Sequence, residues 1–214
     1  MDMKRIITTI LAASMMLIGT TAFAQASIGA GYLNSTSKVT YSNKVYNTPY
    51  NGFYAGLGYD INEGAGFGIN TGVYFSYILS NNSGSIGSIV SGSLKTTETY
   101  IDVPTRINIS TDLGSIRASV FAGPVFSYGI TSTSKASGSI AGIEIGTGEV
   151  DNYSKSDYNR FDIQVGGGVN IDLMNMLRLT ASYDLGMLNR FKVEEGDDYK
   201  STRNVLRVGL AFLF

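Results

Sequence analysis

Large apolar side chains recur at every second position in the last thirteen residues of the chain, 202–214. The apolar parity is occupied by Leu206, Val208, Leu210, Phe212 and Phe214. The other parity carries charged or small residues, namely Arg203, Arg207, Gly209 and Ala211. A period of two is the period of a β-strand whose two faces meet different surroundings. The stretch therefore predicts a terminal strand with one apolar face and one polar or small face.

Seven earlier segments alternate in the same way. They cover residues 26–34, 52–61, 67–79, 98–110, 116–130, 160–171 and 177–185. Each run reaches the roughly nine to eleven residues that a tilted strand needs to cross a bilayer. Together with the last stretch, they predict eight strands.

The connections between these segments alternate in length. Long connections are 35–51, 80–97, 131–159 and 186–201, and short ones are 62–66, 111–115 and 172–176. Tight periplasmic turns and long external loops give this alternation in a barrel that spans a membrane, with both termini on the periplasmic side. The sequence thus predicts an all-β fold, an antiparallel eight-stranded transmembrane up-and-down β-barrel. The loops 80–97 and 131–159 either extend the strands as hairpins or fold over the mouth, and ten strands result if 139–150 forms an extra pair.

Charged residues within the predicted strands lie on the parity opposite to the apolar one. They are Arg106, Arg117, Arg160, Arg178 and Arg207, with Asp60, Glu98, Asp102, Asp162 and Asp184. A charge on a lipid-facing position at mid-bilayer would cost about 2–4 kcal/mol, so the apolar parity is the one that suits lipid. A soluble ligand-binding barrel would place its apolar face inward instead.

The ten charged residues are candidates for a network inside the barrel. An eight-stranded barrel has an interior that side chains just fill, and each charge buried there needs a partner. One hypothesis is a lumen plugged by ion pairs. The alternative is a narrow pathway whose charged lining selects ions, and both hypotheses use the same residues.

The first two dozen residues have the pattern of a secretory signal peptide. Lys4 and Arg5 precede an apolar run, and Ala22-Phe23-Ala24 is a small-x-small cleavage site. We expect residues 1–24 to be cleaved and residues 25–214 to form one barrel domain. An uncleaved anchor is the alternative, but the apolar run is shorter than the ~20 residues of a spanning helix.

Composition narrows the classes of function. Without Asp2, Lys4 and Arg5, 14 basic and 16 acidic residues remain, which argues against a nucleic-acid partner. The chain has no Cys, which removes disulfides and thiolate sites, and no His, which removes His metal sites and Ser-His-acid catalysis. We therefore expect no enzyme activity, no catalytic residue, no metal and no cofactor.

Several short segments carry a resemblance to a known family. They are Tyr100-Ile-Asp-Val-Pro104, Phe121-Ala-Gly-Pro124, Gly166-Gly-Gly-Val169, Tyr183-Asp-Leu-Gly186 and the terminal Phe212 and Phe214. With its strand pattern, the chain resembles the small outer-membrane β-barrel domains of the OmpA/OmpX-like, porin-family type. The resemblance implies the outer membrane of a Gram-negative bacterium. It also implies that Val208, Leu210, Phe212 and Phe214 are read by the outer-membrane assembly machinery.

Every Lys of the predicted mature chain falls in an external loop. Cations at that rim suit the phosphates of lipopolysaccharide in the outer leaflet. The predicted contacts are Lys95, Lys155, Arg190 and Arg203, and the alternative is ordinary solvated loop charge.

The expected function is a structural or surface-interaction role, in which the loops are exposed to an extracellular partner. The alternative is a narrow porin that passes ions or small solutes. Outer-membrane lipids are partners in either case, and the sequence predicts no oligomeric state.

Overall fold

The computed structural model describes residues 24–41, 44–62, 66–86, 90–140, 143–155, 158–191 and 199–214. The predicted signal peptide lies outside the described residues except for Ala24, which begins the first strand. Among the described residues, no helix has the length and apolarity needed to cross a membrane.

Nine strands and one short helix make up the described chain. The strands are β1 (Ala24–Tyr41), β2 (Lys44–Asn62), β3 (Phe67–Ile86), β4 (Val90–Leu113), β5 (Ile116–Ile140), β6 (Ile143–Asp151), β7 (Phe161–Leu173), β8 (Leu177–Gly186) and β9 (Lys200–Leu213). The helix α2 (Asn152–Lys155) has a single turn.

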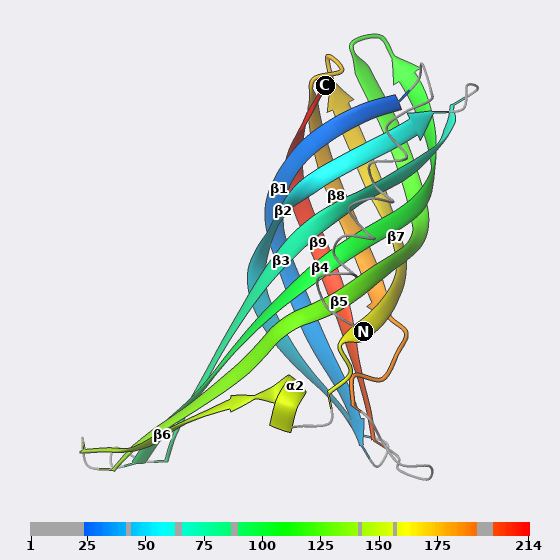
Figure 1. Ribbon diagram of the computed structural model, residues 1–214. Coiled ribbons are helices and arrows are strands. Elements are labelled where there is room, and N and C mark those ends of the chain that lie inside the picture. The colour runs from blue at the N-terminus through cyan, green and yellow to red at the C-terminus, as the bar shows by residue number, and fades with distance from the viewer. Residues whose placement is uncertain are drawn as a thin grey trace.

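Eight of these strands form a closed, antiparallel ring (Figure 1). Neighbours along the chain pair with each other, except that β5 pairs with β7, and β1 closes the ring by pairing with β9. At the seam, the backbone N–H of Ala26 donates to the carbonyl of Phe214, and Phe214 donates back to Ala26. The prediction of an eight-stranded barrel is confirmed. The segment 139–150 does not widen the ring, because β6 pairs with β5 alone.

The two faces of the ring follow the parity of the sequence. Outward apolar residues are exposed, for example Leu57 at 59% and Ile107 at 66%, whereas inward residues such as Asp184 and Ser76 are fully buried. This apolar outer band with a polar interior is the arrangement that lipid requires.

Three strands continue well past the ring. The ends of β3, β4 and β5 project together with β6 as an antiparallel sheet (Figure 1), here called the arm and defined as residues 80–86, 90–97, 131–140 and 143–151. Much of three of the four predicted long loops therefore forms paired strands, because β1 and β2 also stay paired through the described residues of 35–51. The sequence predicts that the segments 80–97 and 131–159 either extend the strands as hairpins or fold over the mouth. The arm corresponds to the first alternative.

Along β5, the neighbouring strand changes from β7 to β6. Pairing between β5 and β7 ends at Tyr128 and Phe161, and pairing between β5 and β6 begins at Thr133 and Asp151. A bulge lies between these points, because Thr99 faces Thr131 while Tyr100 faces Gly129, which leaves Ile130 without a partner on β4. At the bulge the inward parity of β5 shifts by one residue, and for this reason Ser132 is buried.

Candidate functional site

Alternating strand positions carry the charged side chains into the lumen, where they form a ladder of shared ion pairs. At mid-height, Asp184 on β8 accepts hydrogen bonds from Arg106 on β4 at 2.8 Å and Arg207 on β9 at 2.7 Å. The same Arg207 donates to Asp102 at 2.9 Å. Each group is nearly or fully buried. The sharing matters because a buried charge without a partner is strongly destabilising.

Hydroxyl groups complete the coordination of Asp102. Ser76 on β3 donates to one carboxylate oxygen at 2.6 Å, and Ser127 on β5 donates to the other. With Arg207, these donors come from three different strands. The ladder is thus tied to the wall by hydrogen bonds from uncharged hydroxyl groups as well as by ion pairs.

The external level of the ladder is centred on Glu98. Arg190 donates to this carboxylate at 2.6 Å, the hydroxyl of Tyr100 donates at 2.9 Å, and Ser132 lies at 3.3 Å. Arg190 follows the end of β8, so the chain turns back into the mouth of the barrel here.

Arg203 links the external and middle levels. Its guanidinium lies 3.5 Å from Asp102 and 3.6 Å from Asp162, and it stacks 3.8 Å from the centre of the Tyr100 ring. Both Arg190 and Arg203 are buried. Their predicted place on the external rim is therefore wrong, since their charges are used inside the lumen and not available to lipopolysaccharide.

The periplasmic level is held by Arg178 on β8. It pairs with Asp172 on β7 at 2.6 Å and with Asp60 on β2, and Asn70 donates to Asp60. Asp172 is absent from the predicted network because it falls in a predicted turn. Its parity, shared with the inward Asp162, is the signal that could have found it.

Two predicted members lie outside the ladder. Arg117 pairs with Asp112 at 2.6 Å at the periplasmic rim, where both side chains are partly exposed. Arg160 donates to the carbonyls of Gly129 and Ile130. The other eight predicted residues face the lumen. With Asp172, Arg190 and Arg203 they form what we call the lumen network: Arg106, Arg178, Arg190, Arg203, Arg207, Asp60, Glu98, Asp102, Asp162, Asp172 and Asp184.

Apolar side chains share the lumen with this network. The buried cluster consists of Leu33, Tyr54, Ile78, Tyr100 and Val205, with Tyr50 and Tyr74 packed against it. Arg106 also lies 4.7 Å from the centre of the Phe121 ring. The inward parity of Leu33, Tyr54 and Ile78 in the sequence is the signal that could have predicted this packing.

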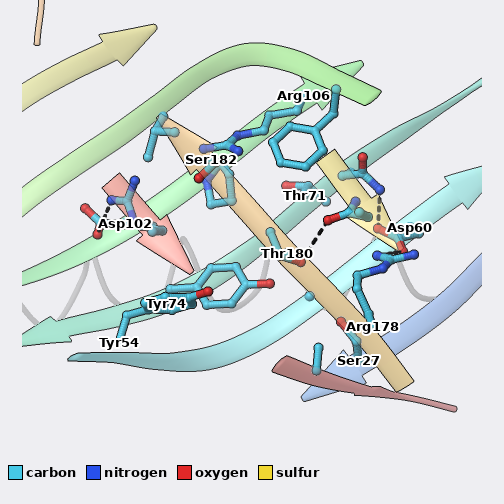
Figure 2. A pocket seen from close by; sticks show the side chains of 18 of the residues that line it. Ser27, Tyr54, Asp60, Thr71, Tyr74, Asp102, Arg106, Arg178, Thr180 and Ser182 are labelled. Atoms are coloured by element: carbon cyan, nitrogen blue, oxygen red, sulfur yellow. Dashed lines mark hydrogen bonds and ion pairs between the residues drawn. The ribbon is translucent and has the colours of Figure 1, made fainter. Parts of the chain in front are cut away.

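A cavity of about 100 Å³ lies in the lumen between the middle and periplasmic levels (Figure 2). Arg106 and Asp102 border it at one end, and Asp60 and Arg178 border it at the other. Tyr54 and Tyr74 form part of its wall. Ion pairs therefore bound the cavity at both levels.

The remaining candidate residues lie outside the lumen. Lys95 is exposed on β4 in the arm, and its neighbour across the ladder is Lys135 of β5. Lys155 ends α2, and its side chain lies outside the described part. Val208, Leu210, Phe212 and Phe214 all point outward and are exposed. The described part of the chain brings together no group of His, Cys, Asp or Glu that could hold a metal ion.

Comparison with solved structures finds several small outer-membrane barrels. The attachment invasion locus protein Ail of Yersinia pestis, solved in complex with the heparin analogue sucrose octasulfate, is 16% identical over 89% of this chain and 99% of its own, with a TM-score of 0.44. Neisserial surface protein A, from Neisseria, is 14% identical over 90% and 98%, with a TM-score of 0.42. A major outer membrane protein of Thermus thermophilus is 11% identical over 89% and 99%, with a TM-score of 0.44.

Comparison with curated proteins finds no match. A family model described as outer membrane protein beta-barrel domain matches residues 20–192, which is most of the chain. The match agrees with the closed ring, its apolar outer face and its charged interior. The chain belongs to the outer membrane protein beta-barrel domain family, and it is a protein of the outer membrane of a Gram-negative bacterium.

Proposed function

We propose that this protein is a non-conducting, non-enzymatic barrel that acts structurally and through its external surface. The observation that carries the proposal is the ladder of shared ion pairs, which crosses the lumen at three levels. The absence of His from the sequence supports the non-enzymatic part.

The ladder is suited to closing the lumen because its members hold one another. Arg207 joins Asp102 to Asp184, and Arg106 binds both oxygens of Asp184. Opening a path here requires guanidinium groups to leave carboxylates in a confined, poorly hydrated space, and breaking a buried pair costs about 3–5 kcal/mol. A path that opens at this cost would be rarely populated.

Single-channel recording tests the proposal. The expected mature chain, refolded and inserted in a planar bilayer in symmetric salt, should give no steady openings. Heat-modifiable migration on a gel must show in parallel that the barrel has folded. Reproducible openings of uniform size would overturn the proposal.

A narrow porin is the second candidate, and two observations favour it. The lumen contains the cavity of about 100 Å³. Two residues that line it also have buried atoms without a hydrogen-bond partner among the described residues, Oδ1 of Asn70 and Nε of Arg106. Substitution Arg106→Ala should raise conductance only if this guanidinium blocks a water path, and Arg117→Ala at the rim is the matched control.

The arm supports the surface-interaction part of the proposal. It presents polar strands and exposed lysines beyond the ring, where an extracellular partner can meet them. Lys95 has no described carboxylate partner, whereas Lys135 pairs with Glu149 at 2.7 Å. We propose Lys95 and Lys155 as contacts for lipopolysaccharide phosphates. A Lys95→Glu, Lys155→Glu variant that still co-purifies with lipopolysaccharide at the wild-type ratio would refute these contacts.

The two ends of the chain are proposed to serve export and assembly. Residues 1–24 would direct secretion and be removed, and N-terminal sequencing of protein from outer membranes should begin at Gln25. Val208, Leu210, Phe212 and Phe214 would be read by the assembly machinery while they are exposed on the last strand.

A further inference from the structure

Where β5 changes its pairing partner from β7 to β6, a hollow lies in the barrel wall. Its volume is about 670 Å³, within the range of ligand pockets. It lies where β5 and β7 stop pairing and before β6 takes over, next to the unpaired Ile130. A continuous ladder would have filled this space with backbone.

One side of the hollow continues the lipid-facing surface. Tyr128 and Phe161 occupy the last paired positions of β5 and β7 on the apolar parity, and Leu188 lies just past β8. Phe161 and Leu188 are exposed, as is the adjacent Met187. Apolar and aromatic side chains therefore line the side of the hollow that adjoins the lipid-facing surface.

The other side carries a cation. Nη1 of Arg160 donates to the carbonyls of Gly129 at 3.2 Å and Ile130 at 2.9 Å, and the guanidinium lies 4.4 Å from the centre of the Tyr153 ring. Its Nε and Nη2 have no hydrogen-bond partner among the described residues, and the residue lines the hollow. No described carboxylate forms an ion pair with Arg160. The nearby Asp151 is exposed, and it accepts a hydrogen bond from the backbone N–H of Tyr153.

We propose that this hollow binds a lipid of the external leaflet whose phosphate headgroup has a net negative charge. An acyl chain would lie against Tyr128, Phe161 and Leu188, and the phosphate would bind the free edge of Arg160. A guanidinium edge matches two phosphate oxygens, and aromatic side chains favour headgroup depth. The hollow is continuous with the face that already meets lipid, which is why a lipid fits it better than a soluble anion does. The site does not depend on whether the lumen conducts.

A simpler role for Arg160 is structural, since Nη1 satisfies two carbonyls that the departing β7 leaves unpaired. That role uses one nitrogen and predicts no preference among lipids. The test must therefore measure lipid selectivity as well as folding.

Photo-crosslinking provides that measurement. The mature chain would be refolded in phosphatidylcholine vesicles that contain a few per cent of phosphatidic acid with a diazirine in its acyl chain. We expect the label on peptides that contain Tyr128, Phe161 or Leu188, and much less label from a diazirine phosphatidylcholine at the same level. Equal labelling by the two lipids would overturn the proposal.

Variants separate binding from structure. Arg160→Gln keeps an amide donor for the carbonyls but removes the charge, so labelling should fall about tenfold. Arg160→Lys keeps the charge but loses the planar edge, so it should retain only part of the labelling. Arg117→Gln, the same change at the opposite rim, should have no effect. Undiminished labelling of Arg160→Gln would refute the site, and so would full competition by millimolar inorganic phosphate, which would identify a free-anion site. If Arg160→Gln does not fold, Leu188→Ser takes its place, and unchanged labelling of that variant would equally refute the site.

Discussion

Single side chains in the lumen are stabilised by sharing. Asp184 is fully buried and serves two arginines, Arg106 and Arg207. Arg106 pairs with no other carboxylate among the described residues, whereas Arg207 also reaches Asp102. The removal of one carboxylate therefore leaves positive charge uncompensated in the interior of the barrel.

This arrangement predicts a large effect of Asp184→Ala. The free energy of unfolding should fall by about 3–5 kcal/mol, as it does when one partner of a buried pair is removed. Urea titration of the refolded barrel, followed by loss of heat-modifiable migration, measures the change. Asp112→Ala removes the carboxylate of the exposed pair with Arg117 and should have no measurable effect. Equal stability of the two variants would contradict the importance of the ladder.

Gly31 on β1 lies beneath the inward-facing ring of Tyr54. A Cβ added to Gly31 would lie 2.3 Å from the carbonyl oxygen of Val208 and 2.8 Å from Cε1 of Tyr54. Neither neighbour can move freely, because one is backbone and the other belongs to the packed lumen cluster.

Gly31→Ala should therefore destabilise the barrel by about 1–3 kcal/mol, the usual cost of overpacking. Gly148→Ala on β6 is the matched control, since nothing lies within 4 Å of its added Cβ. The same urea titration should leave the control unchanged. A loss of stability in both variants would point to strand propensity rather than to the Tyr54 contact.

At the scale of elements, alternation predicted the strands of the ring but not their full length. In the arm, three consecutive residues of β5, Lys135, Ala136 and Ser137, are all exposed, so no apolar parity marks the strand. Both faces meet water there, and the backbone ladder holds the strands. Apolar and polar residues alternate in a strand because its two faces meet different surroundings. Where both faces meet water, as in the arm, the alternation is absent.

The lumen network was predictable only in part, for a related reason. Parity gives the direction of a side chain within a strand, and Asp102, Asp184 and Arg207 lie on the inward parity and are buried. Arg203 shares the parity of Arg207 and could have been assigned with them. Arg190 lies beyond β8, where no parity applies, and its direction depends on finding Glu98 across the lumen. The pairings themselves depend on register, which parity does not fix.

The last strand carries a prediction of its own. Phe212→Ser should reduce the amount of folded barrel in outer membranes by more than Phe75→Ser does. The two side chains are similarly exposed to lipid, at 48% and 46%, so their burial energies are matched. Heat-modifiable protein in isolated outer membranes measures the difference. An equal decrease would show that Phe212 contributes to lipid contact alone and not to the proposed assembly signal.

The whole molecule has two parts with separate sources of stability. The ring is closed by pairings from β1 to β9 and filled by the lumen network, whereas the arm rests on backbone ladders between polar strands. Three members of the lumen network, Glu98, Asp102 and Arg106, lie on a strand that enters the arm. All three lie on the ring side of Thr97, so the network itself stays within the ring.

Removal of the tip of the arm should therefore leave the ring intact. Replacing residues 81–95 by a two-residue turn joins Ser80 to Thr96, which already face each other across β3 and β4. Heat-modifiable migration should persist, while the proposed lipopolysaccharide contact of Lys95 is lost. Failure of this variant to fold would show that the arm contributes to closing the ring.

Shared carboxylates also restrict which residues can change independently during evolution. When one acid pairs with two arginines, replacing that acid removes a partner from both buried cations. We therefore expect any single substitution among the three residues to lower stability. Related genes should therefore change Asp184, Arg106 and Arg207 together or keep all three. Asp112 and Arg117 lie at the rim, where water can solvate either one alone, so they should drift independently.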